Sequence, residues 1–252
     1  PDGVTVERLL SHTSGLSLTG YPGFPPEKTL PSIEASLAGS TGRFFGFYSP
    51  PRVKIIHQLG TKWKYSGGGY TVLQLLIEEV SESAFSEYME MSVLSPLGMA
   101  SSTFDYDRVD IDRLAIGHSR RGRPQPNYLF TARAAAGFYT TAGDLALLLR
   151  DLDSGVRSGE GILSPSAYRE LTTPRAVVTE GIEMGLGFHL EKLPDGATMA
   201  FHFGANRGWQ SYFGINLDDG HGIVILTNGD SGIEEFVDPV LESYRRWLGR
   251  TE

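Results

Sequence analysis

Cysteine is absent from this sequence of 252 residues. Its absence excludes disulfides, thiolate metal sites and cysteine nucleophiles, although a chain without cysteine is compatible with either redox environment. Long apolar runs are absent too, because no stretch approaches the roughly 18–20 residues that cross a bilayer. We therefore expect no membrane span.

Positive charge is scarce, with 22 Lys and Arg against 30 Asp and Glu, a net charge of −8 and a pI of about 5.3. The basic residues form no long run, so nucleic acid and anionic membrane surfaces are poor candidate partners. No histidine has the i, i+4 spacing with a carboxylate that a helical zinc site needs, and we expect neither a metal nor a cofactor. The six histidines are His12, His57, His118, His189, His202 and His221.

An initiator methionine and a signal-peptide pattern are also missing, since the sequence begins Pro1-Asp2. We expect the chain to be the later part of something longer. Its length is sufficient to bury a sizeable core, and a single domain over residues 1–252 is the expectation.

The most informative stretch is residues 64–70, Lys-Tyr-Ser-Gly-Gly-Gly-Tyr, which directly precede an apolar segment. Apolar residues within 71–80 recur at the spacing of a helix that buries one face, so a glycine-rich turn is predicted to hold Tyr65 and Ser66 just ahead of this helix. Three glycines permit positive φ or the close approach of another group. The alternative is a flexible loop before a core helix, with a buried tyrosine.

Helical patterns dominate the first part of the chain and strand patterns the last part. Further helices are predicted over 4–10 (ended by Gly15), 84–94 (ended by Pro96 and Gly98), 145–152 (with a capping box from Thr141), 165–171 (capped by Ser164) and 233–248. Strands are predicted over 199–203, 209–217 and 222–227, the last two joined by a hairpin at 218–221. This order favours an α+β architecture, helical and loop-rich over about 1–195, with a sheet meander and closing helix over about 196–252.

The segment His202-Phe203-Gly204 places an imidazole and a glycine within an apolar strand of edge type. Glycine in a strand marks either a β-bulge, which is the favoured explanation for this segment alone, or the close approach of a ligand. Strand alternation predicts Phe203 in the core and His202 and Gly204 on one cleft-facing side near Tyr65. A Gly-x-Ser-x-Gly elbow is missing from the sequence, which argues against an α/β-hydrolase.

Four ordered segments resemble the serine β-lactamase and penicillin-binding-protein superfamily, in its branch of class C-like β-lactamases, D-alanyl-D-alanine carboxypeptidases and esterases. Residues 4–16 are similar to the helix and loop that follow the nucleophile helix, and residues 60–70 to the Tyr-x-Asn element. Residues 136–145 resemble a Gly-x-x-Ser/Thr-x-x-Asp-Leu helix start, and His202-Phe203-Gly204 occupies the place of Lys-Thr-Gly or His-x-Gly. The resemblance implies a β-lactamase/transpeptidase-like fold, an antiparallel sheet flanked by helices with a helical subregion.

Two departures from the family pattern matter. Gly67 stands where the family has the asparagine of Tyr-x-Asn, so that contact with substrate and lysine is lost or moved. No serine has a lysine three positions later, and the spacing Thr61 to Lys64 lies inside the loop before Tyr65. The family's Ser-x-x-Lys would precede Pro1, so we expect an N-terminally truncated member.

The resemblance also implies roles for individual residues. Tyr65 and His202 would be catalytic, the tyrosine as the base or proton relay and the histidine as a neutral or partly charged donor. The substrate would be bound by Ser66, Gly67, Gly204, Ala205 and Asn206, with the Ala205 N–H in the oxyanion hole.

Two functions fit these expectations. The first is a serine hydrolase that cleaves an amide or ester bond of a small-molecule or peptide substrate, completed by its own upstream segment or another protomer. The second is a non-catalytic binding module with a cleft lined by Tyr48, Tyr65 and Trp209. Substrate, oligomeric state and compartment are left open, although relatives are often exported to the cell envelope.

Overall fold

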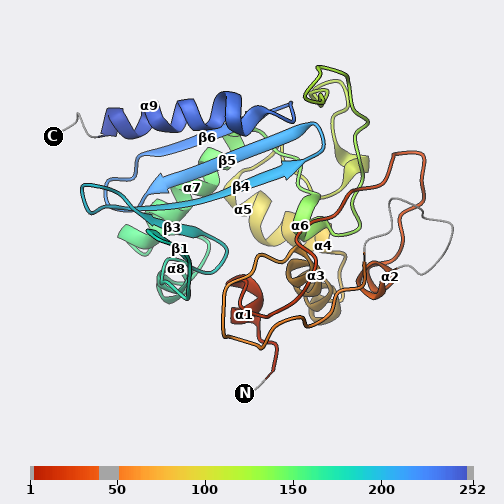
Figure 1. The fold of residues 1–252 in the computed structure, drawn as a ribbon, viewed down its shortest axis with the longest axis horizontal. Helices are drawn as coiled ribbons and strands as arrows, with labels where there is room; N and C mark the ends of the chain where they lie inside the picture. The colour runs from red at the N-terminus through yellow and green to blue at the C-terminus, as the bar shows by residue number, and fades with distance from the viewer. Residues whose placement is uncertain (1–2, 40–50, 249–252) are drawn as a thin grey trace.

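The computed structural model describes residues 3–39 and 51–248 (Figure 1). Six antiparallel strands form one sheet in the order β1-β2-β3-β4-β5-β6, so each strand pairs with the next along the chain. The strands are β1 Ala176–Thr179, β2 Ile182–Met184, β3 His189–Lys192, β4 Thr198–Asn206, β5 Trp209–Asn216 and β6 Gly222–Thr227.

Helices cover both faces of this sheet (Figure 1). On one face, α9 (Asp238–Leu248) and the π-helical turn Ile233–Val237 pack against alternate residues of β4 such as Met199 and Phe201. On the other face, α7 (Ala142–Arg157) and α8 (Pro165–Leu171) pack against Ala200 and its neighbours. This division follows from the alternation of side chains along each strand.

A second group of helices lies beside the sheet and surrounds α3 (Gly67–Ser81), which contacts α1, α2, α4 and α6. These smaller helices are α1 Val6–Leu10, α2 Ile33–Ala38, α4 Phe85–Met89, α5 Ser95–Leu97 and α6 Arg133–Ala136, with a π-helical turn Glu90–Leu94 between α4 and α5 and a 3-10 turn Tyr106–Arg108. Leu9, Leu16 and Leu73 form the small core between α1 and α3.

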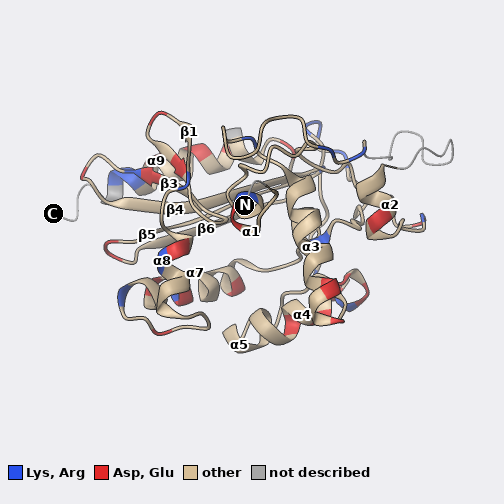
Figure 2. Cartoon of the chain, turned by 90° about the horizontal axis from the view of Figure 1, so that it is seen from below, with Lys and Arg blue, Asp and Glu red and all other residues tan. Residues whose placement is uncertain are grey.

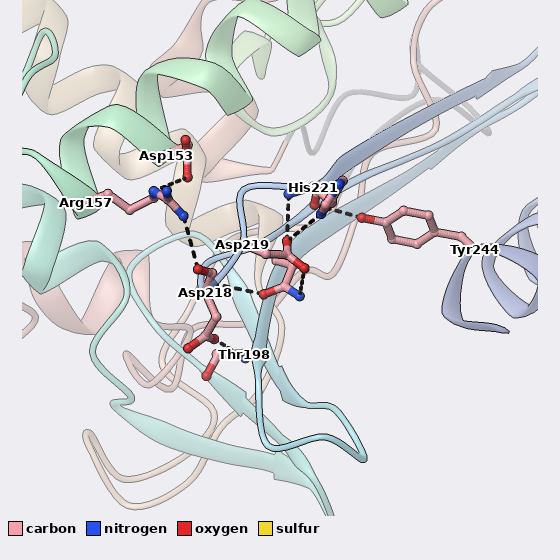
Figure 3. A network of polar contacts seen from close by, with 8 residues as sticks. Asp153, Arg157, Thr198, Asp218, Asp219, His221 and Tyr244 are labelled. Atoms are coloured by element: carbon pink, nitrogen blue, oxygen red, sulfur yellow. Dashed lines mark hydrogen bonds and ion pairs between the residues drawn. The ribbon is translucent and has the colours of Figure 1, made fainter. Parts of the chain in front are cut away.

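The loop between β5 and β6 ties together elements from both faces of the sheet (Figure 3). Arg157 of α7 pairs with Asp153 at 3.4 Å and donates to the carbonyl oxygen of Asp218 at 3.1 Å. The Asp218 carboxylate accepts from the Thr198 N–H of β4 at 2.8 Å. Tyr244 of α9 donates to the His221 carbonyl at 2.7 Å. The hairpin therefore contacts the last residue of α7, the first residue of β4 and the body of α9.

The predicted α+β order, the hairpin and the caps at Thr141 and Ser164 are confirmed. Several predicted boundaries were wrong. The sheet begins at Ala176 rather than near residue 196, and α7 runs over Ala142–Arg157 rather than 145–152. The predicted end of the helical segment at Gly98 is confirmed, since Gly98 caps it in a left-handed conformation, but the π-helical turn carries the helix past Pro96. Helix α1 is ended by His12, not Gly15, in the left-handed conformation.

Charged residues of both signs are interspersed around α7, α8 and α9 (Figure 2). In the part of the chain that the structure describes, no helix is both long and apolar enough to cross a membrane.

Candidate active site

The three glycines of the motif form the first turn of α3, not a loop ahead of it. Ser66 is the N-cap, and its hydroxyl accepts from the Gly69 N–H at 3.0 Å. A Cβ on Gly67 would lie 2.9 Å from Thr19 O, and one on Gly68 would lie 2.7 Å from Ser17 O. Glycine is needed because the backbone of residues 17–19 packs directly against this turn.

Tyr65 lies immediately before this cap, among the rings of residues far apart in sequence. Its ring centroid is 4.2 Å from that of His12 and 6.2 Å from that of His202. The predicted proximity of Tyr65 and His202 is therefore observed. Among the described residues the Tyr65 hydroxyl has no hydrogen-bond partner. Its capacity to donate and accept a proton is thus not used by the described chain.

No cation favours the phenolate of Tyr65 within the described chain. Burial raises the pKa of Tyr65 above its ordinary value, and nothing else shifts it. The two nearest imidazoles are neutral near pH 7, because burial lowers the pKa of His12 to about 3 and that of His202 to about 4. A tyrosine in this setting is protonated and needs an added positive charge before it can act as a base.

His202 is carried by β4, on the sheet face that α7 also covers. Its ring centroid lies 5.8 Å from that of His189 on β3. Burial lowers the pKa of His202, and the nearby His189 lowers it further. The family resemblance implies that His202 is a neutral or partly charged donor. Its buried environment favours the neutral form.

Gly204 does not mark a β-bulge, because β4 and β5 pair without a shift of register from Met199↔Asn216 to Asn206↔Trp209. The strand lies between β3 and β5 in the sheet order, but its pairing with β3 ends at His189↔Phe201, so from residue 202 onward it is an edge on that side, as predicted. A Cβ at Gly204 would lie 2.8 Å from the Ser211 hydroxyl on β5. A side chain at this position would therefore have to displace the Ser211 hydroxyl.

Beyond Phe201, the β4 backbone is open on its β3 side. The pairing of β3 with β4 ends at His189↔Phe201, and no described strand pairs with residues 202–206 on that side. Ala205 is exposed, while the Asn206 side chain donates to Ala136 O of α6 at 3.0 Å. The backbone groups of this stretch that face the β3 side are therefore not paired with a neighbouring strand.

Phe203 is not in the core as predicted. It lies on the opposite face from His202, as alternation requires, but it is 45% exposed. Val237 and Leu241, from α9 and the turn before it, cover Met199 and Phe201. They do not cover Phe203.

Ser66 and Gly67 are both buried, with Ser66 only 1% exposed and its hydroxyl donating to Ser17 O at 2.9 Å. The structure gives them a part in holding α3, and their contact with substrate stays a prediction. Trp209 packs against Gly117. Tyr48, the third predicted cleft residue, lies outside the described residues.

Sequence reasoning missed three members of the site: His12, Trp63 and His189. Trp63 lies 6.4 Å from His12 and 6.0 Å from His189, measured between ring centroids. The Nε2 atoms of both histidines and the Trp63 Nε1 are buried without a hydrogen-bond partner in the described chain. His189 gave no signal because the strand that carries it was not recognised.

A surface hollow of about 470 Å³ lies away from these rings, beside the middle of α3. Its polar walls are engaged, since Gln74 donates to Thr131 O and Arg133 to the Ser86 hydroxyl. Over residues 3–39 and 51–248, no group of three or more His, Asp or Glu could hold a metal ion.

Comparison with known proteins places this geometry in a family. The family model called Beta-lactamase matches residues 1–240. The chain is 34% identical over 174 residues to a human beta-lactamase-like protein, covering 68% of this chain and 32% of that protein. It is 23% identical over 248 residues to penicillin-binding protein 4* of Bacillus subtilis (strain 168), covering 92% of this chain and 53% of that protein. The chain thus spans at most about half the length of these two relatives.

A solved structure agrees with the family model. The octameric penicillin-binding protein homologue from Pyrococcus abyssi is 25% identical, with a TM-score of 0.73 over 95% of this chain and 56% of that one. The predicted fold class and the predicted resemblance are both confirmed. The chain belongs to the Beta-lactamase family.

Proposed function

We propose that this chain supplies Tyr65 and His202 to the active site of a serine hydrolase. The hydrolase would cleave amide or ester bonds through an acyl-enzyme. The observation that carries the proposal is the proximity of the two rings, 6.2 Å between centroids, beside an open stretch of β4 backbone in a member of this family. Ala205 and Gly204 on that stretch would contact the carbonyl group of the substrate.

The proposed reaction has two halves. A serine hydroxyl attacks the carbonyl carbon while its proton passes to Tyr65, directly or through a lysine, and the Ala205 N–H stabilises the resulting oxyanion. Collapse of the tetrahedral intermediate breaks the bond to the amine or alcohol, which leaves with a proton from the same relay. Water then attacks the acyl-serine by the same route and releases the acid.

The serine and lysine of this mechanism are proposed to lie outside the 252 residues. No serine in the sequence is followed three positions later by lysine, and the one serine beside Tyr65, Ser66, is engaged as a helix cap. The raised pKa of Tyr65 supports the same conclusion, because an adjacent ammonium group would be needed to lower it.

The second candidate is a non-catalytic binding module that keeps the cleft without a nucleophile. The missing Ser-x-x-Lys favours it, whereas the Tyr65 hydroxyl, which has no hydrogen-bond partner among the described residues, favours the hydrolase. The two candidates differ in whether a covalent intermediate can form.

Intact mass spectrometry after incubation with a fluorescent penicillin or a fluorophosphonate separates these candidates. The 252-residue chain alone should give no adduct, and the chain extended by its own upstream coding sequence should be labelled on the serine of Ser-x-x-Lys. A stoichiometric adduct on a serine within the 252 residues would contradict the proposed site. An upstream sequence without Ser-x-x-Lys, and no labelling of the longer protein, would favour the binding module.

A further inference from the structure

His12 has a backbone conformation that few side chains adopt. It lies just beyond the cap of α1 with a φ of 55°. Its N–H donates to Leu9 O at 3.3 Å, and the next N–H, that of Thr13, donates to Arg8 O at 2.9 Å. These two bonds define a Schellman motif, in which the left-handed position is usually glycine because a Cβ is disfavoured there. A histidine at this position calls for a further explanation.

The contacts of His12 supply one, because it bonds to both neighbours of Tyr65. Its Nδ1 accepts from the Ser66 N–H at 3.1 Å, and its carbonyl oxygen accepts from the Lys64 N–H at 2.9 Å. Its ring also lies 4.2 Å from the Tyr65 ring, measured between centroids. One residue therefore restrains Tyr65 from both sides along the chain and also packs against its ring.

The protonation state of His12 suits this contact. An Nδ1 that accepts a hydrogen bond carries no proton, so a neutral ring has its proton on Nε2. Burial, with smaller contributions from His202 and His189, lowers the pKa of His12 to about 3. The residue, only 1% exposed, thus remains an acceptor down to strongly acidic pH.

We propose that His12 is a positioning residue that fixes the Tyr65 phenol by holding the peptide groups on both sides of it. The left-handed conformation of residue 12 would suit glycine, but glycine has no side chain to accept from the Ser66 N–H. Histidine supplies this acceptor. The inference rests on the proposed role of Tyr65 in proton transfer, and it assigns no contact between His12 and the substrate.

Two substitutions separate the acceptor from the backbone conformation. His12→Asn keeps a side-chain acceptor near the Nδ1 position, and asparagine tolerates the left-handed region. His12→Gly also suits that region but has no acceptor. A local loss of protection at the Ser66 amide in His12→Gly but not in His12→Asn therefore reports on the hydrogen bond to Ser66 and not on backbone strain.

Glu82→Gly is the matched control for the backbone change. Glu82 also has a left-handed φ, 53°, and its side chain is exposed. It caps the C-terminal end of α3, whereas Ser66 caps the N-terminal end of the same helix. This substitution therefore places glycine at a left-handed position remote from Tyr65.

Hydrogen exchange of the Ser66 amide, followed by NMR in the 252-residue chain, is the first measurement. His12→Gly should raise the exchange rate of this amide about tenfold relative to His12→Asn, the worth of one buried hydrogen bond. The Lys64 amide should change much less in both variants, because its acceptor is the backbone carbonyl of residue 12. Unchanged Ser66 protection in His12→Gly, or equal loss in Glu82→Gly, would overturn the proposal.

The second measurement is kcat and KM for an ester substrate. It uses the chain extended by its own upstream coding sequence, which is expected to supply Ser-x-x-Lys. His12→Gly should lower kcat about 10- to 100-fold with little change in KM, as expected for a displaced reacting group, and His12→Asn should recover most of the loss. Loss of Ser66 protection without a change in kcat would show that the contact does not position Tyr65. If Tyr65→Phe also leaves kcat unchanged, the proposed function fails, whereas the exchange result still decides whether His12 holds this segment.

Discussion

Tyr65 and Tyr70 show how two tyrosines five positions apart differ in their chemistry. The Tyr70 hydroxyl donates to Leu10 O at 3.1 Å, whereas the Tyr65 hydroxyl has no partner among the described residues. Burial raises the pKa of both phenols. Of these two, only Tyr65 therefore has a hydroxyl that is available for proton transfer.

Replacement of each tyrosine by phenylalanine tests this difference. In the chain extended by a Ser-x-x-Lys segment, Tyr65→Phe should lower kcat by roughly 10²–10⁴-fold, the usual worth of general acid–base catalysis, and should leave Tm nearly unchanged. Tyr70→Phe should instead lower Tm with little effect on kcat, because it removes a hydrogen bond to α1. Steady-state kinetics and thermal unfolding measure both effects, and an unchanged kcat in Tyr65→Phe would remove this residue from the mechanism.

At the scale of elements, the sequence predicted those whose signal is local. Helix α7 begins where the Thr141 cap predicted it, and the hairpin between β5 and β6 has the turn residues that such a loop needs. Strands β1 to β3 were missed because they are short and carry charged residues such as Glu183 and Glu191, so no long apolar alternation marks them.

The candidate site was predicted only in part, for a related reason. Tyr65 and His202 belong to motifs that can be read along the chain, but the role of Ser66 depends on contacts with residues 17–19, which are distant in sequence. His12 was likewise assigned to no site, since its contact with Ser66 joins residues 54 positions apart. Local patterns cannot specify such pairings.

Helix α7 offers a test of packing at the scale of one element. A Cβ on Gly155 would overlap the ring of Tyr168, which is 1% exposed and whose hydroxyl donates to Asp151 at 2.6 Å. Gly155→Ala should therefore destabilise the protein by about 1–3 kcal/mol, although alanine is the better helix former.

Gly143, in the first turn of the same helix, is the matched control for Gly155. A Cβ there meets only the Thr141 hydroxyl, at 3.8 Å, so Gly143→Ala should be neutral or stabilise by up to about 1 kcal/mol. Urea unfolding of the two variants measures both free energies. Equal effects of the two substitutions would show that α7 and α8 do not pack as closely as the structure indicates.

At the scale of the whole molecule, the buried histidines link the site to stability. The pKa of His12 is lowered to about 3 and that of His202 to about 4, and the pKa of His189 is lowered as well, in each case chiefly by burial. These three residues come from the end of α1, from β3 and from β4, so they join the helical region to the sheet. Charging any of these imidazoles would place a buried charge in this part of the molecule.

Acid should therefore destabilise the native state. Below the ordinary histidine pKa of 6.5, the unfolded chain binds protons that the folded chain excludes until the pH approaches each lowered pKa. Stability is thus fully present above about pH 6.5 and falls as the pH drops toward about 4, by up to about 1.4 kcal/mol per pH unit for each buried histidine. Urea unfolding at a series of pH values across this window measures the slope.

Single substitutions assign that slope to particular residues. His12→Asn and His202→Gln each remove one group that titrates only in the unfolded chain, so each should reduce the slope by up to about 1.4 kcal/mol per pH unit. A double variant of His12 and His202 that keeps the full slope would show that acid sensitivity arises elsewhere, and that these imidazoles are not held neutral by the packing around Tyr65.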